Sequence, residues 1–166
     1  MMMAKLILLA SFLALTTIHG ADQTNARAAF TQLQTLVGEW EGKTEAGRVL
    51  KVSYRLTAAG TVLVETWTLG PQRESLTLYH MDNESLIATH YCPVGNQPRL
   101  RLKEGGKPSL LIFEFVSATN LSKPEVAHQH RFEMELLEAN SFARSETYLE
   151  NGKGESERIV YSRVVH

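Results

Sequence analysis

Ten short segments with strand character follow one another along this chain, and they leave little room for any fold other than an antiparallel sheet. Each is about five to ten residues long and rich in β-branched and aromatic residues. Tight turns separate them, such as Asn151-Gly152, a favoured hairpin dipeptide because both central residues take positive φ. The predicted strands are Glu39–Thr44, Val49–Thr57, Thr61–Leu69, Ser75–Met81, Leu86–Cys92, Arg99–Lys103, Ser109–Val116, Ala127–Leu137, Ser141–Leu149 and Glu157–Val165.

We expect these strands to close into a barrel. Consecutive strands joined by tight turns form a meander, and closure removes the exposed edges that an open meander would leave. One helix is predicted before the strands, over Thr24–Leu36, because Phe30, Leu33 and Leu36 recur at helical spacing. The expected fold class is therefore all-β, an up-and-down antiparallel barrel of about ten strands with one short N-terminal helix.

The first 21 residues are typical of a signal peptide. Lys5 supplies a basic start, and the apolar run Leu6–Leu15 is too short to span a bilayer comfortably. An uncleaved N-terminal anchor is the alternative. We therefore expect export to the periplasm or the extracellular space, no membrane association after cleavage, and a single domain over residues 22–166.

Composition excludes some functions and leaves others open. The formal net charge is −1 and no run of Lys or Arg appears, so the positive field that nucleic-acid binding needs is missing. Cys92 is the only cysteine, so the chain cannot form an internal disulfide. Motifs of hydrolases, zinc proteases and phosphate-binding loops are absent from the sequence, which favours a binding protein over an enzyme.

The strand Ala127–Leu137 carries the most unusual pattern of side chains. Because side chains alternate along a strand, His128 and His130 are predicted to share a face with Phe132, Met134 and Leu136. The opposite face is charged, so we expect both histidines to face the barrel interior. Buried imidazoles need polar partners, and this pair therefore predicts a site.

Two binding uses of these histidines are open, and a third alternative is a barrel filled by its own side chains, with a structural or interaction role. One is a polar patch that orients a small, largely apolar ligand. The other is binding of haem or a divalent metal, which is not favoured because a metal needs a third ligand. His90 is the best candidate for that third ligand, and His80 is another. The predicted ligand-binding residues are His90, His128, His130, Tyr54, Trp67, Phe132 and Met134.

The strand around Glu65 has two possible orientations. In one, Glu65 faces inward with Leu63 and Trp67, and then needs a cation as its partner. In the other, Val62 and Val64 face inward and Glu65 lies in water. If Glu65 faces inward, general acid/base catalysis by Glu65 and a histidine stays open.

The chain resembles lipocalin-like (calycin) barrels. A helix leads into Val37–Gly42, where Gly38 and Trp40 form the Gly-x-Trp pattern of the first strand in that superfamily. The resemblance implies that Arg163, on the last strand, packs over Trp40 and closes the barrel end. Three segments also resemble uncharacterised bacterial exported proteins of this class: Thr89–Cys92, Gly95–Arg99 and His128-x-His130. Without disulfides, the resemblance points to fatty-acid-binding-protein-like or nitrobindin-like relatives.

Overall fold

The computed structural model describes residues 20–70, 73–105 and 107–165. Nearly all of the predicted signal peptide, residues 1–19, lies outside these ranges. Within them, no helix is both long and apolar enough to cross a membrane.

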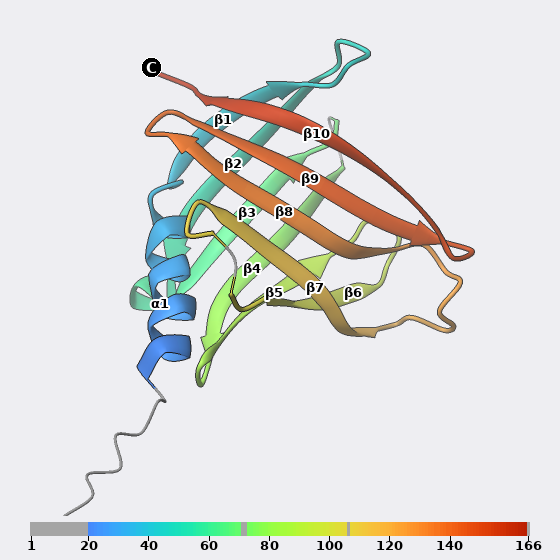
Figure 1. Ribbon diagram of the computed structural model, residues 1–166. Helices are drawn as coiled ribbons and strands as arrows, with labels where there is room; N and C mark the ends of the chain where they lie inside the picture. The colour runs from blue at the N-terminus through green and yellow to red at the C-terminus, as the bar shows by residue number, and fades with distance from the viewer. Residues whose placement is uncertain (1–19, 71–72, 106, 166) are drawn as a thin grey trace, which may run out of the picture.

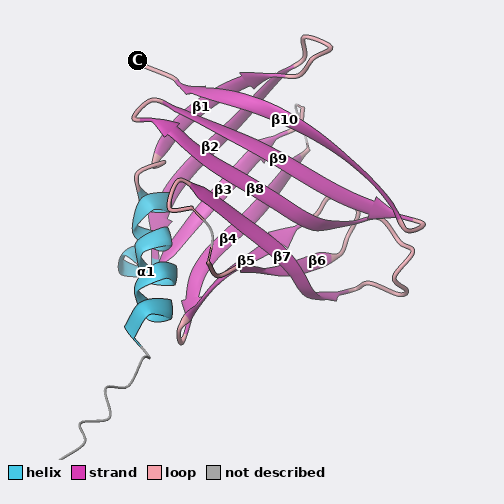
Figure 2. Cartoon of the chain, in the orientation of Figure 1, coloured by secondary structure: helices cyan, strands magenta, loops and turns pink. Residues whose placement is uncertain are grey.

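Ten strands of the described residues close into an antiparallel barrel, which confirms the predicted fold class (Figures 1 and 2). Each strand pairs with its neighbours in the sequence, and β1 pairs with β10 to complete the ring. The strands are β1 (Gly38–Lys43), β2 (Val49–Thr57), β3 (Val62–Thr68), β4 (Glu74–Asp82), β5 (Ser85–Tyr91), β6 (Gln97–Leu102), β7 (Leu110–Thr119), β8 (His128–Glu138), β9 (Ser141–Glu150) and β10 (Lys153–Arg163).

The turn between β9 and β10 has the predicted chemistry. Asn151 and Gly152 have φ of 53° and 73°, the positive values that a tight hairpin requires. The two strands pair continuously from Lys153↔Glu150 to Ser162↔Ser141. This long hairpin supplies one wall of the barrel.

The barrel closes over a short stretch only. β1 and β10 share three residue pairs, from Trp40↔Arg163 to Gly42↔Tyr161. β10 continues beyond them to Lys153, whereas β1 ends at Lys43 and turns away into β2. A gap in the wall therefore lies between the β1–β2 hairpin and the first half of β10, at the top of Figure 1.

Helix α1 (Gly20–Gln34) begins and ends a few residues earlier than predicted, and it packs against β4 and β5. Ala29, Phe30 and Leu33 from the helix join the core cluster that continues through the barrel interior. The helix lies beside the strand ends at one end of the barrel (Figure 2). It covers apolar surface there and leaves the opposite end uncovered.

Trp40 and Arg163 join this helix to the barrel. The Arg163 guanidinium lies 4.2 Å from the centre of the Trp40 ring, a cation–π geometry. Its two terminal nitrogens donate hydrogen bonds to Thr35 O and Val37 O, at 2.8 and 2.7 Å. Trp40 is buried, and its Nε1 donates to Leu36 O at 2.7 Å. Both side chains therefore hold the turn that follows α1 and leads into β1.

Replacing Arg163 should destabilise the fold measurably. Arg163→Ala removes the cation–π contact and two hydrogen bonds to the helix end, and should lower the free energy of unfolding by about 1–3 kcal/mol. Urea denaturation followed by tryptophan fluorescence measures this change. The matched control is Arg158→Ala on the same strand, which removes an exposed ion pair with Glu135 and should cost less than about 1 kcal/mol. Equal effects of the two substitutions would contradict the role of Arg163.

Candidate functional site

A buried carboxylate, Glu65 on β3, lies at the centre of the barrel. It faces inward with Leu63 and Trp67, so the first of its two possible orientations is correct, and its side chain is fully buried. Tyr54 and Tyr79 donate hydrogen bonds to its Oε2 at 2.9 and 2.7 Å. Trp67 Nε1 donates to Oε1 at 2.6 Å. Three neighbouring strands thus supply donors to one carboxylate.

The cation that Glu65 requires is Arg144 on β9. Its Nη1 lies 2.6 Å from Glu65 Oε2 and also donates to Tyr79 Oη at 3.0 Å. Its Nε donates to Glu146 Oε1 at 2.6 Å, and its guanidinium lies 4.2 Å from the centre of the Phe132 ring. The remaining nitrogen, Nη2, is buried and has no hydrogen-bond partner. Arg144 therefore bridges two carboxylates inside the barrel.

Burial and charge set the protonation of this network. Burial raises the pKa of Glu65, but the Arg144 charge and the three hydrogen bonds outweigh it, so the pKa falls below its usual value. Burial raises the pKa of Tyr54 and Tyr79, which stay protonated and can donate. Burial also raises the pKa of Glu146, and Arg144 offsets that effect only in part. Of the two carboxyl groups in this network, Glu146 therefore takes up a proton more readily than Glu65.

His90 on β5 is also buried and faces the interior. Its Nδ1 lies 3.1 Å from Thr77 Oγ1, and its Nε2 lies 3.2 Å from Tyr148 Oη. Burial lowers its pKa to about 4, so the ring is neutral at physiological pH. Both ring nitrogens are within hydrogen-bond distance of hydroxyl groups, so neither is free to coordinate haem or a metal from the barrel interior.

A pocket of about 330 Å³ leads from the surface to this network. It lies at the start of β2 and the end of β3, which is the end of the barrel away from α1. Five of its eleven lining residues are apolar or aromatic and the other six are charged or polar, with Arg144 and Glu146 at the deep end. The lining residues are Arg48, Leu50, Trp67, Arg144, Glu146, Tyr148, Glu155, Ser156, Glu157, Ile159 and Tyr161.

The pocket exposes one of the two charges at its deep end and hides the other. The Glu146 side chain is 29% exposed, whereas that of Arg144 is 1% exposed. Glu146 is surrounded by protein, yet its carboxylate is open toward the pocket. The hydroxyl of Tyr161 also lines the pocket, and it has no hydrogen-bond partner in the described part of the chain.

The prediction that both histidines of β8 face the interior is wrong. His128 pairs with Leu149, the neighbour of the inward Tyr148, so it lies on the outer side of the barrel wall. The residue that faces inward is Gln129, which pairs with Tyr148 and is fully buried. A β-bulge between Gln129 and Arg131 shifts the alternation, and His130 lies at this bulge.

The histidine pair lines a separate pocket of about 460 Å³ with the loop that precedes β8. His130 stacks on Phe115 with ring centres 5.4 Å apart, and His128 Nδ1 donates to Val126 O at 2.8 Å. Burial lowers the pKa of His130, and the charge of His128 adds to that effect. No three His, Cys, Asp or Glu side chains of the described residues group closely enough to hold a metal ion. His90 therefore does not form one site with His128 and His130.

Of the seven predicted ligand-binding residues, Trp67 alone lines the interior pocket. Tyr54, Phe132 and Met134 are inward but are packed in the core, where they surround Glu65 and Arg144. Sequence reasoning missed Arg144, Glu146 and Tyr148. Their spacing along one strand was a usable signal, because residues two apart share a face.

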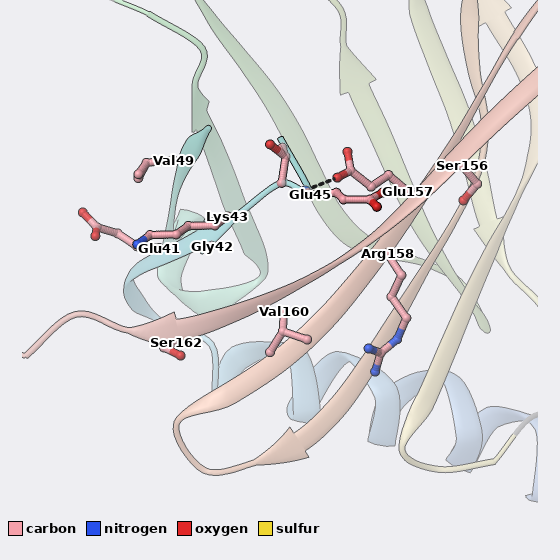
Figure 3. A pocket seen from close by; sticks show the side chains of 11 residues that line it. Glu41, Gly42, Lys43, Glu45, Val49, Ser156, Glu157, Arg158, Val160 and Ser162 are labelled. Carbon is pink, nitrogen blue, oxygen red and sulfur yellow. Dashed lines mark hydrogen bonds between the residues drawn. The ribbon is translucent and has the colours of Figure 1, made fainter. Parts of the chain in front are cut away.

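A larger hollow, about 960 Å³, lies outside the barrel and has different chemistry. It follows the gap between β1 and β10, and its side chains are spread along both strands (Figure 3). One hydrogen bond crosses it, from Glu45 N to Glu157 Oε1 at 2.9 Å. Its polar groups do not converge on one point, so we consider the smaller interior pocket to be the candidate site.

Comparisons with known proteins support the fold. No protein-family model and no curated protein match this chain. It is similar to the crystal structure of Rv2717c from M. tuberculosis, with a TM-score of 0.54 and 15% identity over 82% of this chain and 98% of that one. It is also similar to a DUF3598-family protein of unknown function from Nostoc punctiforme, with a TM-score of 0.53 and 15% identity over 80% of this chain and 49% of that one. At this level of identity, both likenesses bear on the fold alone.

The lowered pKa of His90 predicts a loss of stability on acidification. Between pH 6.5 and about 4, the unfolded chain binds a proton at His90 and the folded protein does not, so stability falls as pH falls. The shift corresponds to roughly 3 kcal/mol by pH 4. Urea denaturation at pH 7 and pH 4 should therefore show a smaller loss for His90→Gln than for the unsubstituted protein.

Tyr148→Phe is the control for this measurement. It removes the hydrogen bond to His90 but keeps the imidazole, so it should cost about 1 kcal/mol at both pH values and keep the pH-dependent loss. The same loss in His90→Gln as in the unsubstituted protein would show that another group causes it.

Proposed function

We propose that this chain is a binding protein for a small organic molecule, held in the interior pocket between β2, β3, β9 and β10. The observation that carries the proposal is the pocket itself, in which aromatic walls lead to convergent polar groups. Trp67, Tyr148 and Tyr161 supply the walls, and Glu146 lies at the deep end. Known ligand sites combine these features in the same way.

The size and place of the pocket fit this role. A volume of about 330 Å³ is at the lower end of the range of small-molecule sites, so the ligand should be small. The surrounding network is rigid, since Glu65 alone receives hydrogen bonds from three side chains and an ion pair from a fourth. A preformed pocket loses little entropy when it binds a ligand.

We also propose that the protein is exported. The support comes from the N-terminal sequence, with its basic start and short apolar run before residue 21. An exported binding protein would meet its ligand outside the cytoplasm.

Blocking the pocket should abolish binding of a lipophilic probe. We expect the neutral dye N-phenyl-1-naphthylamine to gain fluorescence when it enters the pocket. Glu155 lines the pocket and is exposed, so Glu155→Trp should fill the opening and weaken dye binding at least about tenfold. Fluorescence titration gives the dissociation constant.

The control places the same substitution at the other end of the barrel. Glu138 is exposed where β8 ends, outside the set of pocket residues, and Glu138→Trp should leave the dye affinity unchanged. The proposal would fail if the dye did not bind, or if Glu155→Trp bound it as tightly as Glu138→Trp.

A further inference from the structure

We propose that the ligand of the interior pocket is an organic cation, an amine with an apolar body, whose ammonium group is held by Glu146. This inference rests on the function proposed above and names the class of ligand. It follows from the charges that a ligand can reach, from an unpartnered hydroxyl and from the apolar walls.

The accessible charge at the deep end of the pocket is negative. Glu65 and Arg144 pair at 2.6 Å, and their side chains are 0% and 1% exposed, so their charges compensate each other out of reach of a ligand. The Glu146 side chain is 29% exposed and lines the pocket. One of its oxygens accepts a hydrogen bond from Arg144 Nε, and the buried Gln129 side chain is a second hydrogen-bonding neighbour that lowers the pKa of Glu146. A carboxylate has about four acceptor positions, so capacity remains for a ligand.

An anionic ligand would not find a matching partner here. Two of the three Arg144 nitrogens already donate to Glu65, Tyr79 and Glu146. The third, Nη2, has no partner, but it is buried rather than exposed in the pocket. An anion would therefore meet the Glu146 carboxylate before it met an available guanidinium nitrogen, and like charges repel.

A second acceptor for the ammonium group is the Tyr161 hydroxyl. Tyr161 is 2% exposed and lines the pocket, and its hydroxyl has no hydrogen-bond partner among the described residues. The hydroxyl oxygen is open to the pocket rather than sealed in the core, so it can accept a hydrogen bond from a ligand. An ammonium group has three donors and can satisfy Glu146 and Tyr161 at once, whereas a carboxylate has none.

The pocket opening and walls fit the rest of such a ligand. Glu155 and Glu157 line the opening against a single cation there, Arg48, so carboxylates predominate around an incoming cation. Leu50, Ile159 and the Trp67 ring supply apolar surface for the body of the ligand. A small aromatic or aliphatic amine matches both features.

The experiment compares three ligands of nearly equal shape and different charge. Isothermal titration calorimetry of the full mature chain at pH 8 measures 2-phenylethylamine, 2-phenylethanol and phenylacetate. The amine should bind at least about tenfold more tightly than the alcohol, and phenylacetate should bind most weakly. Because burial raises the pKa of Glu146, the affinity for the amine should fall as pH is lowered, while that for the alcohol should not.

A matched pair of variants assigns the preference to Glu146. Glu146→Gln keeps the shape and an acceptor for Arg144 but removes the charge, so it should abolish the preference for the amine over the alcohol. Glu150→Gln, four residues further along β9 and outside the set of pocket residues, should behave like the unsubstituted protein. Circular dichroism establishes that each variant is folded.

Each outcome decides between this inference and the function on which it rests. Equal affinities for amine and alcohol, or tightest binding of phenylacetate, would overturn the amine inference while the binding function stands. The unsubstituted protein supplies these results even if Glu146→Gln fails to fold. Failure of all three ligands and of the neutral dye to bind would instead overturn the proposed binding function.

Discussion

The ion pair between Glu65 and Arg144 is the interaction on which the interior of this barrel depends. Two charges removed from water are tolerated only when each is paired and hydrogen-bonded. Here the carboxylate receives donors from Tyr54, Trp67 and Tyr79, and the guanidinium also contacts Glu146 and Phe132. The network joins β2, β3, β4 and β9 across the barrel, so it fixes how these strands face one another.

The same network shapes the interior pocket that we propose as the binding site. Arg144 is occupied by its partners, so Glu146 is the charged group that is accessible at the deep end of the pocket. Tyr148 is held by His90, and His90 by Thr77, which orients one aromatic wall. The helix packs at the far end with Trp40 and Arg163, and the interior pocket opens at the end where β2 begins. A buried charge pair, an open carboxylate and one open end together define the site.

The sequence predicted the fold well because its signals are local. Turn dipeptides such as Asn151-Gly152 and the alternation of side chains indicate strands and their order. The site, in contrast, depends on contacts between residues that are far apart in the sequence. Glu65 had two possible orientations, and its partner Arg144 is 79 residues further along the chain. The histidine pair was misplaced because a β-bulge at His130 shifts the alternation, and a bulge has no clear signal in this sequence.

A double-mutant cycle on Glu65 and Arg144 tests the central role of this ion pair most directly. Glu65→Gln and Arg144→Met should each lower the free energy of unfolding by about 3–5 kcal/mol, because each leaves the other charge buried and unpaired. The double variant should lose at least about 2 kcal/mol less than the sum of the two, measured by urea denaturation at pH 7. Losses that add to within about 0.5 kcal/mol would show that the two side chains act independently, and would contradict this account.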